Sequence, residues 1–189
     1  LGGPSVYPYQ PEKLYEGIVV DAPYPSTKWG VSTGEELYRR SLYTFWKRTM
    51  PHPAMTTFDS PNREFCTVRR ARTNTPLQAL TLWNEPGYLE AARQLGTRMV
   101  REGGPDDSTR VAFAFRLATG RRPKATEIAV LTKTLAQLRT DFIAHGSDAY
   151  AFVKTGASPI DATLAPAELA ATTAVASMIL SLDETITKN

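Results

Sequence analysis

The sequence predicts a mostly α fold: an antiparallel helical bundle of five to six helices, with an extended Pro/Tyr-rich N-terminal arm and a long ordered loop. Three observations lead to this prediction. Apolar residues recur at spacings of three and four over most of the chain after residue 75. Glycine and proline signals separate these stretches. Five prolines fall within the first 34 residues, and each removes an amide donor that a helix would need.

A chain of 189 residues that is 42% hydrophobic is large enough to bury one core, so we expect a single domain. Residues 1–34 form the predicted arm and residues 35–189 the helical domain. The chain starts on a Gly-Gly-Pro turn without a methionine, which indicates the C-terminal fragment of a longer protein. Lys+Arg 22 against Asp+Glu 19 gives a net charge of +3, much of it between Arg39 and Arg72.

The first helix is predicted after Ser32 or Thr33, which are suitable caps, and it ends near Thr49. Its apolar stripe consists of residues at i, i+4, i+7 and i+8, namely Tyr38, Leu42, Phe45 and Trp46. Residues 51–74 have few periodic apolar positions, which predicts a long irregular segment. Loops of that length in compact domains are usually functional or tightly held.

Capping and stop signals define the remaining helices. Thr75 and Pro76 begin a helix in which Leu77 and Leu80 are expected to face inward. The following helices are predicted from Pro86 to Gly103, from Asp106–Ser108 to Gly120, from Pro123–Thr126 to His145, over 148–153, and over 167–182. The Gly120 turn joins two amphipathic stretches, which is typical of a helical hairpin.

Arginine and aromatic residues concentrate in one part of the chain. Seven arginines lie between residues 39 and 72, and Arg69, Arg70 and Arg72 directly precede the helix start at Thr75. Guanidinium groups and free helix amides both attract anions, so one hypothesis is a binding site formed by Arg40, Trp46, Arg69, Arg70, Arg72 and Asn74. The more common explanation for such composition is a network of ion pairs to Asp59, Glu64, Glu85 and Glu90.

Other reactive residues give weaker signals. Asp59, Glu64 or Glu85 are candidates for the acid and base of a carbohydrate hydrolase, although their spacing does not pair them. His52 and His145 are the only histidines and neither belongs to a ligand cluster, so no metal site is predicted. His52 with Met55 is a poor haem ligand pair. Cys66 is expected to be a buried, inert thiol.

Several classes of protein are excluded by these patterns. One cysteine allows neither an internal disulfide nor a covalent c-type haem, and no cofactor is predicted. No apolar run approaches 18 residues, so no membrane span is expected. The net charge is too small, and recognised motifs too few, to predict nucleic-acid binding.

The run Arg39–Thr49, with Phe58-Asp-Ser-Pro61, Cys66-Thr-Val-Arg-Arg70 and Arg72–Leu80, resembles the planctomycete-type C-terminal domain of unknown function. Shorter motifs extend the likeness along the chain, at Gly3–Val6, Phe115–Gly120 and Ser181–Thr187. The resemblance implies a large exported parent protein, periplasmic or secreted, in which another domain resembles cytochrome c and carries the haem. It brings no established activity and no catalytic residues.

Three functions remain as hypotheses. The first is an accessory or docking domain that binds a partner domain of the same protein, or an anionic polysaccharide, through the arginines. The second is a carbohydrate-active hydrolase, for which a buried carboxylate pair would be the evidence. In the third, the arginine stretch is purely structural. The sequence leaves open whether this domain is an enzyme.

Overall fold

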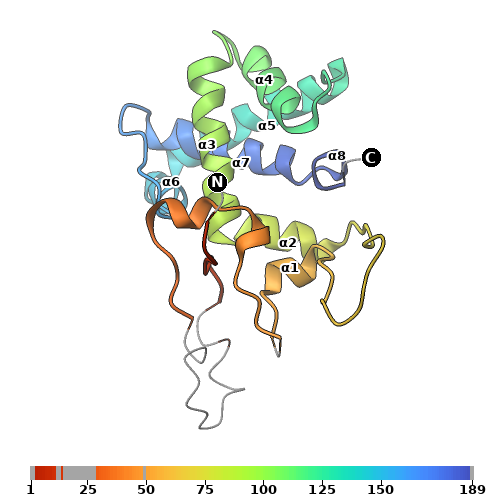
Figure 1. Ribbon diagram of the computed structural model, residues 1–189. Helices are drawn as coiled ribbons and strands as arrows, with labels where there is room; N and C mark the ends of the chain where they lie inside the picture. Colours follow the sequence, from red (N-terminus) through yellow and green to blue (C-terminus); the bar gives the residue numbers. More distant parts are fainter. Residues whose placement is uncertain (1–2, 12–13, 15–28, 49, 188–189) are drawn as a thin grey trace. The chain divides into compact units, whose positions relative to one another are not determined.

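The computed structural model describes residues 3–11, 14, 29–48 and 50–187. The chain divides into two compact units, Leu1–Thr81 and Leu82–Asn189. The mostly α-helical prediction is confirmed (Figure 1). Residues 1–2, 12–13 and 15–28 of the predicted arm lie outside the described residues, and the proposed division at residue 34 stays a prediction. The described α-helices are α1 (Pro53–Thr57), α2 (Pro76–Asn84), α3 (Pro86–Glu102), α4 (Asp107–Thr119), α5 (Ala125–Ala144), α6 (Gly146–Val153), α7 (Pro166–Leu180) and α8 (Asp183–Ile186).

The helix predicted to end near Thr49 is wrong. Among the described residues 33–48, the helical elements are two short 3-10 turns, η2 (Gly34–Tyr38) and η3 (Ser41–Tyr43). The cause is a long-range backbone pairing: Val6 N donates to Tyr43 O at 2.9 Å and Phe45 N donates to Val6 O at 2.8 Å. These bonds hold residues 43–45 extended, and a helix would break both of them.

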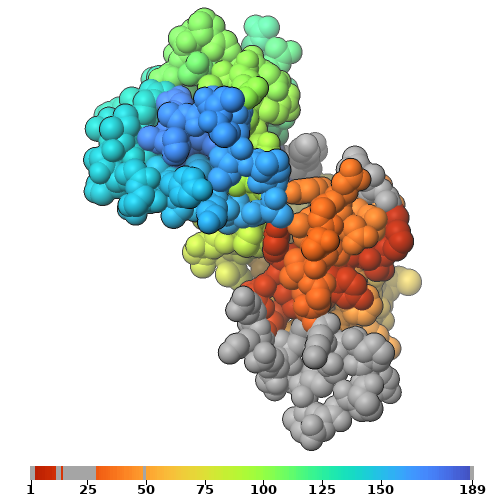
Figure 2. All heavy atoms as spheres, turned by 90° about the vertical axis from the view of Figure 1, so that its left-hand side faces the viewer, coloured from red at the N-terminus to blue at the C-terminus, as the bar shows by residue number. Residues whose placement is uncertain are grey.

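An aromatic cluster stabilises this pairing in the first unit. The rings of Tyr7 and Phe45 stack with centroids 5.0 Å apart, and Trp29 contacts Tyr7 edge-on at 5.1 Å. In Figure 2 the red N-terminal residues and the orange residues that follow position 29 lie against one another. Packing therefore accounts for Phe45, one aromatic residue of the arginine-rich stretch.

Gln78 sets the orientation of α2. Its side chain is 1% exposed and makes three hydrogen bonds, donating to Thr57 O and Thr73 Oγ1 and accepting from Thr75 N. Leu82, one turn later, is also buried. The prediction that Leu77 and Leu80 face inward is wrong, since these side chains are 58% and 60% exposed. A satisfied buried amide outweighs apolar periodicity here.

The second unit is built around α7, which has buried residues on all its sides. Helices α3, α5 and α6 pack against it. Gly96 of α3 permits the closest approach, because a Cβ atom there would lie 2.9 Å from the backbone nitrogen of Thr173. The core consists mainly of Met99, Val111, Phe115, Leu135, Val175 and Ile179.

The predicted helix boundaries in this unit agree with the structure. Pro86 occupies the first turn of α3, with Glu85 as its N-cap. Asp106 caps α4 by accepting from Thr109 N at 2.9 Å. Gly120 ends α4 in the left-handed conformation, with φ of 79°. These local signals fix the order of the elements.

Candidate functional site

The candidate site is the loop Pro61–Asn74, which we call the arginine loop. It belongs to the first unit and joins the segment after α1 to the start of α2 (Figure 1). Its two ends are joined by Asp59, whose Oδ2 accepts from Thr73 N at 2.9 Å and from Thr73 Oγ1 at 2.7 Å. Thr73 Oγ1 in turn accepts from the buried Gln78 amide at 3.1 Å. The base of the loop is thus held by hydrogen bonds.

Every residue of the arginine loop is exposed. Arg69, Arg70 and Arg72 make no hydrogen bond or ion pair with any part of the chain that the structure describes. The loop contains four arginines and one glutamate. Its net charge of +3 therefore equals the formal net charge of the whole chain. The remaining 175 residues are balanced in charge.

The loop also exposes apolar side chains. Phe65 is 69% exposed and Val68 is 104% exposed. The prediction that Cys66 is buried is wrong, because the thiol is exposed. The physical reason is that residues 60–74 form no helix that could carry them into a core. Large apolar groups beside arginines are the composition that protein interfaces favour.

The other predicted binding residues lie on neighbouring segments of the first unit. Trp46 is half-buried, and the guanidinium of Arg63 lies over its ring, 4.7 Å from the centroid. Arg40 is exposed and precedes η3. Asn74 is exposed at the end of the loop. The cation–π contact joins Trp46 to the loop.

The sequence suggested that four carboxylates pair with the loop arginines. In the structure these carboxylates make other hydrogen bonds. Asp59 binds Thr73, and Glu64 accepts from its neighbour Asn62. Glu85 Oε2 caps α3 by accepting from Tyr88 N at 3.0 Å. Glu90 is buried and accepts from the backbone amides of the loop after α6.

Glu85, one of the predicted acid–base candidates, has a raised pKa. Burial raises the pKa of Glu85, the hydrogen bonds from the Tyr88 and Gly87 amides oppose this, and Glu90 adds to the rise. A raised pKa suits a general acid. The carboxylate is occupied as the N-cap of α3, however, where it accepts from Tyr88 N.

His52 is a buried structural residue of the first unit. Its Nε2 donates to Tyr9 O at 2.7 Å, and its ring lies 5.8 Å from that of Trp29. Burial lowers the pKa of His52, and the hydrogen bond to Tyr9 partly opposes this. No three histidine, cysteine or acidic residues gather as metal ligands among the residues that the structure describes. Within the same residues, no helix is long and apolar enough to cross a membrane.

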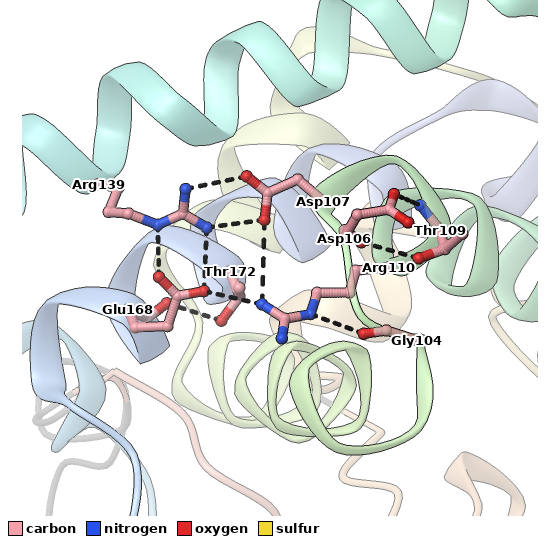
Figure 3. A network of polar contacts seen from close by, with 8 residues as sticks. All are labelled: Gly104, Asp106, Asp107, Thr109, Arg110, Arg139, Glu168 and Thr172. Carbon is pink, nitrogen blue, oxygen red and sulfur yellow. Dashed lines mark hydrogen bonds and ion pairs between the residues drawn. The ribbon is translucent and has the colours of Figure 1, made fainter.

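Two arginines and two carboxylates in the second unit form a closed network (Figure 3). Arg139 donates to both oxygens of Asp107 at 2.9 Å and also to Glu168. Arg110 lies 3.6 Å from Glu168 and donates to Gly104 O. The hydrogen bonds from Arg139 are the main reason why the pKa of Asp107 is lowered. The four charges neutralise one another, and the network ties α4, α5 and α7 together.

Glu90 and Arg93 of α3 anchor the loop between α6 and α7. The Arg93 guanidinium donates to the carbonyl oxygens of Val153, Thr155 and Ser158 and to Ser158 Oγ. Glu90 accepts from Ala157 N at 3.0 Å and from Ser158 N at 2.8 Å. Sequence reasoning missed Arg93. The available signal was its position three residues after Glu90, next to the apolar stripe of α3.

These features define the class of protein: it is a helical protein whose excess positive charge is concentrated in one exposed loop. The family model described as PSD1, protein of unknown function (DUF1553), matches residues 1–135, and the chain belongs to this family. The matched part includes the arginine loop and extends into α5. No curated protein and no solved structure matches the chain.

Proposed function

We propose that this chain is a non-catalytic docking domain that binds an acidic protein surface through the arginine loop. The observation that carries the proposal is the exposure of Arg69, Arg70 and Arg72 without partners in the described part of the chain. Arginine offers five donors in a planar fork that matches carboxylates, and it is enriched at protein interfaces.

The closed base of the loop supports binding over a purely structural role. Asp59, Thr73 and Gln78 hold the ends of the loop together, so part of the entropy of ordering it is already lost in the free protein. A structural loop of this charge would be expected to use its arginines as internal ion pairs. Here the carboxylates that the sequence suggested for them serve other contacts.

A protein partner is favoured over an anionic polysaccharide because of the apolar side chains. Phe65 and Val68 are exposed within the same loop as the arginines. Desolvating such groups contributes to binding when the partner offers an apolar pocket, which a sulfated or carboxylated glycan does not. Glycan binding remains an outcome of the experiment below.

The proposal is tested by titrating the 189-residue chain with poly-L-glutamate and, separately, with a sulfated oligosaccharide, at low and high salt. We expect binding of polyglutamate that weakens with salt and falls at least about tenfold in R69A/R70A/R72A. The control variant, R116A/R122A/K133A, removes the same charge from exposed positions of the second unit and should retain binding. Equal losses in both variants would contradict a specific site, and binding of the oligosaccharide alone would favour the glycan.

The family resemblance supports a further proposal about the parent protein. It is exported to the periplasm or secreted, and its upstream part includes a cytochrome-c-like domain that is a candidate partner. Calorimetric titration of this chain with the haem-bearing portion of the parent tests the pairing. Heat of binding that R69A/R70A/R72A removes is the expected result, and no heat with the unaltered chain would contradict it.

A further inference from the structure

The start of α2 carries exposed leucines directly after the arginine loop. Gln78 and Leu82, four residues apart, are the buried positions of this helix. Leu77 and Leu80, three residues apart, are 58% and 60% exposed. Residues at that spacing are neighbours on a helix surface, so these two leucines form one apolar patch.

This patch lies within reach of the loop's cations. Thr75 caps α2 by accepting from Gln78 N at 3.3 Å, so the loop passes into the helix without an intervening segment. Leu77 follows Arg72 by five positions, which limits the distance between their Cα atoms to about 18 Å. Both belong to the first unit. Arginines and apolar groups thus lie within the span of one short helix on a partner.

We infer that the arginine loop and the Leu77/Leu80 patch together bind an amphipathic acidic helix. The inference rests on the proposed function and adds the shape of the partner. A helix with leucine-like residues at i, i+3 and i+4 and glutamates beside them presents both chemistries at the spacing found here. A flat acidic surface or a free polyanion would use the arginines and leave the leucines in water.

The charge of the loop and the exposed apolar side chains beside it both favour an acidic amphipathic helix as the partner. Of the large hydrophobic side chains that are exposed among the described residues, four lie between residues 65 and 80: Phe65, Val68, Leu77 and Leu80. The loop beside them carries a net charge of +3. An acidic helix neutralises this charge and covers apolar surface in the same contact, which a wholly polar ligand does not.

The experiment measures the binding of three probes to the 189-residue chain by fluorescence anisotropy. The first is a helical peptide of glutamates with leucines at i, i+3, i+4 and i+7, the second is its scrambled sequence, and the third is polyglutamate. We expect the amphipathic peptide to bind at least about tenfold more tightly than the scrambled one. In L77S/L80S this preference should disappear while polyglutamate binding is unchanged.

The matched control is V130S/I143S, which removes two apolar side chains of α5 that are 64% and 68% exposed. It should keep the preference for the amphipathic peptide. Equal binding of the two peptides by the unaltered chain, or a full preference in L77S/L80S, would overturn the inference and leave the docking proposal standing. Undiminished polyglutamate binding by R69A/R70A/R72A would instead overturn the docking proposal.

Discussion

Replacing Arg93 by methionine should strongly destabilise the second unit. Arg93 is 2% exposed, and it binds three carbonyl oxygens and one hydroxyl in the loop after α6. Val153 is the last residue of α6, so its carbonyl has no partner within that helix. Methionine fills a similar volume without any donor. The mutation would leave these acceptors buried and remove a cation that offsets the nearby Glu90.

The magnitude follows from the number and charge of these contacts. A hydrogen bond to a charged group contributes about 1.5–3 kcal/mol, and removing one member of a buried charged arrangement costs roughly 3–5 kcal/mol. We expect a loss in the free energy of unfolding of about 3–5 kcal/mol. For a chain of this length, that corresponds to a decrease in Tm of roughly 10 °C.

Thermal unfolding followed by circular dichroism at 222 nm measures the effect, and urea titration gives the free energy. The matched control is Arg98→Met in the same helix, because Arg98 is a surface residue that pairs with the exposed Glu102 at 2.8 Å and lies over the Phe113 ring, 5.6 Å from its centroid. The control should melt close to the unaltered protein. Equal melting temperatures for the two variants would refute the reasoning, since burial and loop contacts are what distinguish Arg93 from Arg98.

Three further predictions address other parts of the molecule. Limited digestion with trypsin should cut first within the arginine loop, while Arg93 stays protected; early cleavage after Arg93 would contradict the assignment of its contacts. Burial lowers the pKa of His52 in the folded protein below 6.5. The contribution of His52 to the free energy of unfolding should therefore be constant above pH 6.5 and fall as the pH drops from 6.5 through its folded-state pKa. Urea titrations at several pH values measure this fall, which His52→Gln should largely remove, and an unchanged pH profile in that variant would contradict it. Hydrogen bonds from Arg121 are the main reason why the pKa of Glu127 is lowered to about 2. A carbon-detected NMR titration of Glu127 should find its midpoint at that pH, and Arg121→Gln should raise the midpoint. An unchanged midpoint in this variant would show that Arg121 is not the cause.

The later helices could be predicted because their signals are local. Pro86, Asp106 and Gly120 each act through the backbone within one turn, so they mark helix ends whatever the rest of the chain does. The predicted helix ending near Thr49 could not be excluded from local signals of this kind. Its apolar residues do recur at helical spacing in the sequence, but the pairing of Val6 with residues 43–45 joins segments that are far apart in sequence. Periodicity contains no information on such a partner.

Side-chain orientation was harder to predict than helix position. Leu77 and Leu80 suggested an inward face, yet the buried residue is Gln78 because three hydrogen-bonding groups surround its amide. Helix α7 shows the opposite difficulty. Its many small residues give no polar face, and only the packing of α3, α5 and α6 around it explains why all its sides are buried.

The candidate site illustrates how one compositional signal separates into two structural roles. Arginines and aromatic residues are mixed in the sequence, but Phe45 and Trp29 pack in an aromatic cluster while Arg69, Arg70 and Arg72 are exposed. The loop alone accounts for the net charge of +3, so R69A/R70A/R72A leaves a chain of formal charge zero. Long-range attraction of an acidic partner therefore depends on this loop, and the balanced charges elsewhere add little to it. Because the loop carries the whole net charge, the association rate with an acidic partner should lose its salt dependence in R69A/R70A/R72A. That loss would identify the loop as the site of first contact.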